Sequence, residues 1–392
     1  MTLPPHLIAY KDQLVPFKQK YDPESITLYS AAQSLYAGRA RSYFIKSGIK
    51  FEEQTPAQCR FYEVVTPKAG GRSSMPLIEF PDGTVIRDGV AIIDHFEAQR
   101  GHPATPPGAC QRVVSLLFDV IGAEGLIRPA MHYRWNFDAE QGDFIRYHFR
   151  SLFGGLEEPA ESVMRNIKRT AVPDWGVSDL AIPLIEELYE GFLDKFDAHL
   201  KHHPYLLGAV PSVGDFGLIA PLFGHLGRDP VPLRLMQMRA PWVHRWVERM
   251  NSPEPDTGDY LDIETGFLPN DEVPDTLIDL LRHIAIDLVP ETIASHAVIN
   301  RWLATHDVAH GSTCKRYAGE ATFQVNGTEV HIKAQPFRFY LLSRVQEAVA
   351  ALSADQQVSA LALFEQCDMS DLLDLRLDRG IGRANNLEVW LG

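Results

Sequence analysis

The alternation of apolar and polar positions changes along the chain, and this change divides it into three stretches. In residues 26–100, short β-prone runs and runs with helical spacing follow in the order strand, helix, strand and then strand, strand, helix. The strands are expected at 26–30, 49–54, 75–80 and 85–87, and the helices at about 35–47 and 89–99. The first three elements predict parallel strands joined by a right-handed crossover, whereas the turn at 81–84 predicts an antiparallel hairpin.

The other two stretches are mainly helical. A linker rich in Pro and Gly, 101–108, leads into residues 109–251, where strand signals are few and one amphipathic helix runs from Ile182 to about Leu200. Residues 252–392 form a third region with helices near 275–305 and 337–352 and a hairpin around Asn326-Gly327. Residues 1–25 are polar, contain proline and are interpreted as an arm.

Composition narrows the function classes. The fractions of hydrophobic (45%) and charged (22%) residues are those of an ordinary soluble protein, and no apolar run approaches the ~20 residues of a membrane span. The N-terminus lacks the basic and apolar regions of a signal peptide, so a cytoplasmic protein with no membrane partner is expected. A net charge of −14 argues against nucleic-acid binding. The four cysteines are scattered without metal-ligand spacing, so no metal is expected.

The segment Leu28–Arg41 carries a family resemblance. A strand ending in Leu-Tyr, a short loop, a serine near the helix start and an arginine-containing first turn resemble the glutathione S-transferase superfamily, in particular its zeta and theta classes. The resemblance implies an α/β thioredoxin-like N-terminal domain at 26–100 and an all-α C-terminal domain at 109–251. An α-rich extension with a β-hairpin, 252–392, lies outside the usual family.

Ser34 falls at the position of the family's catalytic serine. A hydroxyl that donates a hydrogen bond beside a positive helix N-terminus would stabilise the thiolate of glutathione, whose thiol is otherwise a poor nucleophile at neutral pH. Ser34 is equally interpreted as a helix N-cap, a role compatible with the first. Tyr36 is the second candidate for the sulfur contact, and Tyr29, which core or loop packing also explains, is the third.

Two further motifs would hold the peptide part of glutathione. Met75-Pro76 resembles the family's cis-proline, where the preceding residue pairs through its backbone with the cysteinyl group. Arg87-Asp88 stands where the family has an acid–serine pair, so Asp88 would bind the γ-glutamyl ammonium, with Arg87 or backbone N–H groups on the carboxylate. Asp88 as a plain helix cap is the alternative. Lys68 and Arg72 are candidates for the glycyl carboxylate, or solvated loop charges.

The helical region carries the last two motifs. Residues 203–208 and 211–218 resemble the family's Tyr-Leu-x-Gly and Ser/Thr-x-Ala-Asp segment, with Ser212 and Asp215 as a capping box. Aromatic residues at 132–137 are expected to line a pocket for an apolar electrophile, or else to form plain core. They are His132, Tyr133, Trp135 and Phe137.

Three functions follow from the resemblance. The first is a glutathione transferase-like enzyme that activates the glutathione thiol for attack on a hydrophobic electrophile. The second is a glutathione-dependent isomerase or thiol-transfer enzyme, although a thiol-transfer enzyme normally has cysteine at position 34. The third is a non-enzymatic binding or assembly module, favoured by the Arg87-Asp88 departure and the long extension. A homodimer is implied, and the extension is expected either to be a structural addition or to roof the second-substrate pocket.

Overall fold

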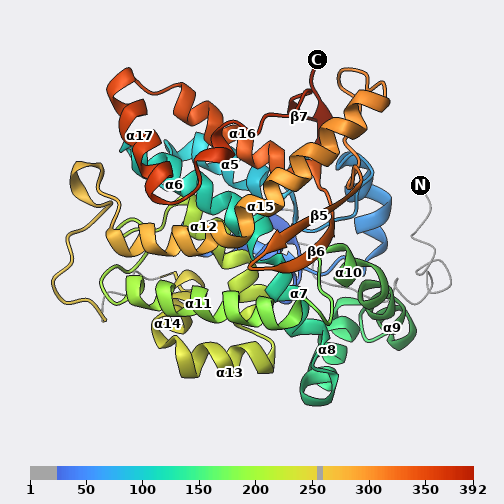
Figure 1. The fold of residues 1–392 in the computed structure, drawn as a ribbon. Coiled ribbons are helices and arrows are strands. Elements are labelled where there is room, and N and C mark those ends of the chain that lie inside the picture. Colours follow the sequence, from blue (N-terminus) through green and yellow to red (C-terminus); the bar gives the residue numbers. More distant parts are fainter. Residues whose placement is uncertain (1–23, 254–258) are drawn as a thin grey trace.

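A computed structural model describes residues 24–253 and 259–392 (Figure 1). Most of the arm expected at 1–25 therefore lies outside the described residues. The rest is a small sheet with two flanking helices, a helical region and a C-terminal extension that wraps back over both. The predicted fold class, a thioredoxin-like domain followed by an all-α domain and an extension with a hairpin, is confirmed.

The N-terminal domain is built on one four-stranded mixed sheet with the order β2-β1-β3-β4. Strands β1 and β2 are parallel, and β3 pairs antiparallel with both β1 and β4, as predicted. The observed elements are shorter than expected by one to three residues at some ends. They are β1 (Ile26–Tyr29), α3 (Ala37–Lys46), β2 (Phe51–Gln54), η1 (Phe61–Val65), α4 (Thr66–Lys68), β3 (Leu77–Glu79), β4 (Val85–Arg87) and α5 (Gly89–Arg100).

Two predicted local features position the site. The Met75–Pro76 peptide bond is cis. Asp88 caps α5, because its Oδ1 accepts a hydrogen bond from Val90 N at 2.9 Å, which satisfies one of the free N–H groups of the first turn.

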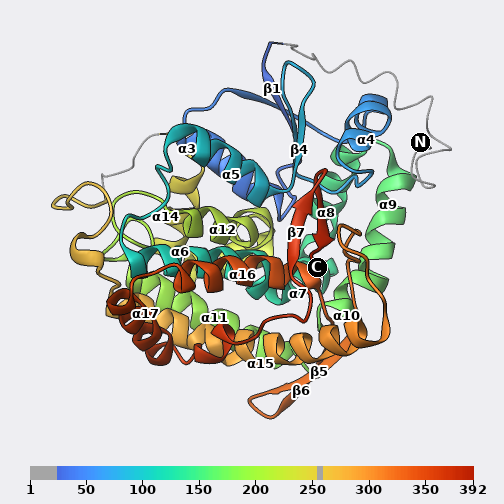
Figure 2. The same cartoon turned by 90° about the horizontal axis from the view of Figure 1, so that it is seen from above.

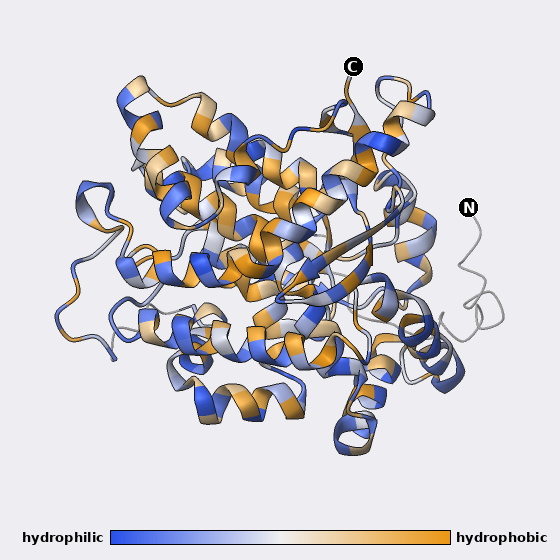
Figure 3. Cartoon of the chain, in the orientation of Figure 1, coloured by the Kyte–Doolittle hydropathy of each residue, from blue (hydrophilic) through white to orange (hydrophobic). Residues whose placement is uncertain are grey.

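The helical domain packs around α12 (Val213–Pro221), all of whose residues are buried. The expected capping box is present: Ser212 Oγ accepts from Asp215 N, and Asp215 Oδ2 accepts from Ser212 N at 2.8 Å. Apolar positions concentrate in the central helices, and polar ones on the outer helices and loops (Figure 3). Its other elements are α6 (Ala109–Val120), η2 (Ile121–Gly125), α7 (Ile127–Trp135), α8 (Asp138–Leu152), α9 (Glu157–Asn166), η3 (Ile167–Ala171), α10 (Val172–Asp174), α11 (Ile182–Leu200), η4 (Leu222–Leu226), α13 (Pro230–Arg239) and α14 (Pro241–Met250).

The extension is part of the same hydrophobic core. Residues of the sheet domain such as Leu28, of the helical domain such as Phe118, and of the extension such as Leu281 and Phe339 belong to one continuous buried cluster. Helix α16 lies along α6, between the sheet and α15 (Figure 2). The extension's elements are η5 (Pro269–Asp271), α15 (Asp275–Thr305), β5 (Glu320–Val325), β6 (Thr328–Lys333), α16 (Pro336–Ala350), α17 (Ala354–Gln366), η6 (Ser370–Leu373), β7 (Ile381–Ala384) and β8 (Leu387–Trp390).

The second hairpin, β7–β8, is not among the elements predicted from the sequence, whereas β5–β6 around Asn326-Gly327 is. Within residues 24–253 and 259–392, no helix has the length and apolar character needed to cross a bilayer. The same described ranges hold no group of three or more His, Cys, Asp or Glu side chains arranged to bind a metal ion.

A buried charge cluster joins the extension to the helical domain. Arg128 of α7 pairs with Asp287 and Glu291 of α15, and Glu291 also pairs with Arg338 of α16. Glu124 lies beside this cluster, 4.0 Å from the Arg338 guanidinium, and burial raises the pKa of its carboxyl to about 7. Arg338 favours the charged form of Glu124, but neighbouring Glu291 opposes it.

Replacing Glu124 by Gln should change how stability depends on pH. The folded pKa near 7 lies above the ordinary ~4.3 of an unfolded glutamate. The folded state therefore holds the proton more tightly, so the stability from this group is full below pH ~4.3 and is lost as the pH rises through about 7. The free energy of unfolding is measured with urea for both proteins at pH 5 and pH 8. The difference, Glu124→Gln minus wild type, should be about 1–3 kcal/mol larger at pH 8 than at pH 5. The exposed Glu347→Gln serves as the control, and parallel pH profiles for Glu124→Gln and wild type would contradict the assignment.

Candidate functional site

Ser34 lies in the loop between β1 and α3. It is half-buried, and its hydroxyl makes no hydrogen bond to any described residue. The residue that precedes α3 is Tyr36, which caps the helix without a side-chain hydrogen bond. The interpretation of Ser34 as the helix N-cap is therefore wrong, and its hydroxyl is left free to contact a ligand.

The helical domain fixes this loop. Arg134 of α7 donates to Gln33 O at 2.8 Å and to Gly224 O at 2.7 Å, and its guanidinium pairs with Asp229 in two hydrogen bonds. Gln33 also donates its side-chain amide to His148 O, at 2.9 Å. Arg134 and Asp229 are both buried, and two hydrogen bonds join them. This bidentate pair therefore holds the loop that contains Ser34 rigidly against the helical domain.

The two tyrosine candidates occupy different environments. Tyr29 is fully buried, and its hydroxyl donates to Glu79 Oε2 at 3.0 Å, while Arg60 pairs with the same carboxylate. Burial and Glu79 raise the pKa of Tyr29 far above its usual value, so Tyr29 fits the packing alternative. Tyr36 is half-buried, and its pKa is raised by burial and by Glu124. Tyr36 and Asp88 line one cavity of about 10 Å³, together with Phe337 of α16. That volume holds about one water molecule.

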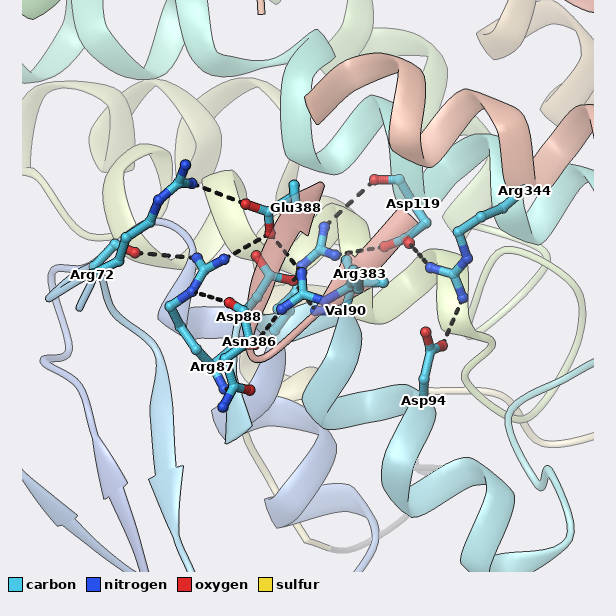
Figure 4. A network of polar contacts seen from close by, with 12 residues as sticks. Arg72, Arg87, Asp88, Val90, Asp94, Asp119, Arg344, Arg383, Asn386 and Glu388 are labelled. Carbon is cyan, nitrogen blue, oxygen red and sulfur yellow. Dashed lines mark hydrogen bonds and ion pairs between the residues drawn. The ribbon is translucent and has the colours of Figure 1, made fainter. Parts of the chain in front are cut away.

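Arg72 and Arg87 converge on one carboxylate, and it belongs to the extension (Figure 4). Glu388 of β8 is buried; its Oε2 accepts from Arg72 Nη1 at 2.9 Å, and its Oε1 accepts from Arg87 Nη2 at 2.7 Å. Arg383 of β7 donates to Glu388 Oε1 at 2.7 Å, and its guanidinium lies 3.8 Å from Asp88 Oδ1. The predicted residues Arg72, Arg87 and Asp88 are thus brought together, around side chains of the C-terminal hairpin.

The tip of the hairpin also covers the edge of the sheet. Asn386 accepts from Arg87 N at 3.1 Å and donates to Val85 O at 2.9 Å, so its amide satisfies the free edge of β4. Lys68 does not join this cluster through its side chain, because its Nζ donates to Gly83 O at 2.7 Å. Its carbonyl oxygen accepts from Asn386 at 3.1 Å.

The remaining candidates separate into two groups. The backbone N–H and C=O of Met75 make no hydrogen bond within the described chain, and its side chain packs against the same apolar cluster as Trp135, Phe149 and Ala31. His132 and Tyr133 do not belong to that apolar cluster. His132 contacts Glu186 at 3.1 Å, and Tyr133 stacks on Phe137 with ring centroids 5.7 Å apart. For these two residues the structure favours the core alternative.

Comparison with known proteins agrees with this architecture. The family model for the glutathione S-transferase C-terminal domain matches residues 179–249. Taken with the sheet order and the cis Met75–Pro76 bond, this match decides the fold. The fold is that of a glutathione transferase. No curated protein matches the sequence.

Solved structures similar to this chain are remote in sequence. A glutathione S-transferase from Methylobacterium radiotolerans in complex with glutathione sulfonate is 15% identical, with a TM-score of 0.37, over 62% of this chain and 99% of its own. The beta-etherase LigF from a Sphingobium strain is 15% identical, with a TM-score of 0.42, over 60% of this chain and 98% of its own. A glutathione S-transferase-like protein from Pseudomonas syringae is 14% identical, with a TM-score of 0.40, over 80% of this chain and 97% of its own.

Sequence reasoning missed Arg383, Asn386 and Glu388. A local signal for the hairpin existed, since β-prone residues flank Asn385-Asn386, and both asparagines adopt positive φ, which this residue type tolerates. Nothing local indicates that this turn docks on β4, some 300 residues earlier in the chain.

Replacing Arg134 by Lys should loosen the Ser34 loop. Lysine keeps the charge opposite Asp229 but cannot bridge it to both carbonyl oxygens. We expect a loss of about 2–4 kcal/mol in the free energy of unfolding, and faster amide exchange at residues 31–36. Arg146→Lys, which alters an exposed pair with Asp143, should change stability by about 0.5 kcal/mol or less. A similarly small effect of Arg134→Lys would contradict the role given to the Arg134–Asp229 pair.

Proposed function

We propose that this chain is a glutathione transferase-like enzyme that activates the thiol of glutathione for attack on a hydrophobic electrophile. One observation carries the proposal: Arg72 and Arg87 together bind a carboxylate, that of Glu388. They do so beside the N-terminus of α5 and the cis Met75–Pro76 bond. Glutathione brings two carboxylates and an ammonium group, and this part of the domain offers two guanidinium groups and the Asp88 carboxylate to match them.

In this proposal each residue has a separate role. Arg87 and Asp88 bind the γ-glutamyl end, Arg72 contributes to carboxylate binding, and the unpaired backbone of Met75 pairs with the cysteinyl group. The thiol proton of glutathione passes to solvent water, and Ser34 donates a hydrogen bond from its hydroxyl to the resulting sulfur anion. The positive end of α3 also favours the thiolate over the thiol. The thiolate then attacks the electrophilic carbon, and the leaving group departs with the bonding electron pair. The electrophile would approach over the apolar cluster that contains Trp135.

A non-enzymatic binding module is the second candidate, and a specific observation favours it. Arg72, Arg87 and Asp88 are engaged by Glu388 and Arg383, and the cavity beside Asp88 has room for about one water molecule. A chain that keeps this arrangement permanently cannot admit a tripeptide at this place.

Ser34→Ala separates the two candidates when it is compared with the wild type by calorimetric titration with reduced glutathione. The wild type should bind saturably at millimolar glutathione and show thiolate absorbance at neutral pH. Because Ser34→Ala removes one hydrogen bond to a charged sulfur, it should raise the pKa of the bound thiol by about one to two. Ser151→Ala, an exposed serine of α8, should behave as the wild type.

Binding with unchanged thiolate absorbance in Ser34→Ala would keep the site but move the sulfur contact to Tyr36. Reduced glutathione could also fail to bind both the wild type and variants in which the contacts of the C-terminal hairpin are weakened. That result would contradict the proposed enzyme and leave the non-enzymatic binding module.

A further inference from the structure

The C-terminal hairpin presents to the N-terminal domain the charges of an amino-acid zwitterion. Its Glu388 carboxylate contacts Arg87 at 2.7 Å, and its Arg383 guanidinium lies 3.8 Å from Asp88 (Figure 4). A γ-glutamyl group carries the same two charges, a carboxylate and an ammonium, on a single α-carbon. Strand β8 is also an extended peptide, as a bound tripeptide would be.

We propose that the hairpin β7–β8 is an autoinhibitory element that mimics the γ-glutamyl end of glutathione and competes with it for Arg72, Arg87 and Asp88. This inference rests on the proposed function, because it assigns a regulation to the same site.

The charge balance of the closed state explains why a ligand must replace the hairpin. Arg87 and Glu388 are both buried, and a buried guanidinium that loses its partner is strongly unfavourable until water or another anion reaches it. The carboxylate of glutathione supplies that anion. Glu388 and glutathione therefore exclude each other from Arg87, and binding of one must lower the occupancy of the other.

The contacts of the hairpin show where it can open. Its attachment to the rest of the extension is by backbone and aromatic packing: Cys314 N donates to Glu388 O at 2.8 Å, Trp390 N donates to Ser312 O at 2.9 Å, and the Trp390 ring stacks on Trp302 at 6.0 Å. Its attachment to the N-terminal domain is mostly polar and runs through the side chains of Arg383, Asn386 and Glu388. Leu387 adds an apolar contact with Gly70. Each of these polar contacts can be replaced by an equivalent contact to a ligand carboxylate or to water. The tip can therefore leave β4 while Trp390 stays in place.

Helix α16 adds a second link between the hairpin and the domain it closes. Arg344 of α16 pairs with Asp94 of α5 at 2.6 Å and with Asp119 of α6 at 3.3 Å. Asp119 also pairs with Arg39 of α3, at 2.8 Å. These ion pairs hold α16 close to α5, with Phe337 in the cavity beside Asp88. Opening the tip alone releases Arg87 and Arg72 from Glu388, although Arg72 Nη2 still donates to Cys314 O at 2.7 Å. Full access to the N-terminus of α5 also needs Phe337 to move.

The test compares full-length wild type with Glu388→Gln, which keeps the shape of the side chain and removes its charge. We expect Glu388→Gln to bind reduced glutathione about tenfold or more tightly than wild type, since the competing closed state loses its charge-assisted contacts. The matched control Glu347→Gln removes an exposed carboxylate of α16 and should bind as the wild type does.

Hydrogen exchange of the wild type provides a readout that does not depend on a variant. Saturating glutathione should speed amide exchange at residues 383–388, while exchange at Gly311, whose N–H donates to Trp390 O, stays slow. γ-Glutamylcysteine should produce the same change, because it keeps the γ-glutamyl zwitterion, and cysteinylglycine at equal concentration should not.

Four results would overturn the inference. If Glu388→Gln and wild type bind glutathione equally, or the tip stays protected with glutathione bound, the hairpin does not compete and the proposed function stands without it. If cysteinylglycine opens the tip as well as γ-glutamylcysteine does, the hairpin does not mimic the γ-glutamyl end. If wild type and Glu388→Gln both fail to bind, the proposed function itself fails.

Discussion

The Glu388 carboxylate is shared by three guanidinium groups, from Arg72, Arg87 and Arg383, and this contact ties the end of the chain to its first domain. Buried charges require partners, so Arg87 at the end of β4 must always face an anion. In the closed arrangement the protein supplies that anion itself. The proposed ligand carries a carboxylate and an ammonium group, which match the charges of the same residues.

The extension can hold this position because it shares the core of the other two domains. Helix α15 packs on α11, α16 packs on α6, and the pairs of Arg128 and Arg338 with Glu291 connect these helices across the interface. The extension is therefore not a separate body, because its buried residues belong to the core of the first two domains. The resemblance implied a homodimer in which one copy's thioredoxin-like domain faces the other's helical domain. Here α16 bridges those two domains within one chain, through Asp94 and Asp119.

Local chemistry made much of the fold predictable. The strand order, the Asp88 cap, the Ser212–Asp215 capping box and the Asn326-Gly327 hairpin each follow from residues close in sequence, and each is present. The site was predictable only in part. Arg72, Arg87 and Asp88 were found from their place in the motifs, but their partners lie about 300 residues away. The helical spacing of His132 and Tyr133 could not distinguish a pocket wall from core, because burial depends on α11, which packs against them.

A crystal structure of the full-length protein with bound glutathione would show whether glutathione takes the place of the hairpin tip. If the hairpin and glutathione compete for Arg87, the structure will have a glutathione carboxylate on Arg87, its ammonium group on Asp88, and residues 384–388 displaced from β4. Glutathione bound elsewhere, with Glu388 still paired to Arg72 and Arg87, would contradict it.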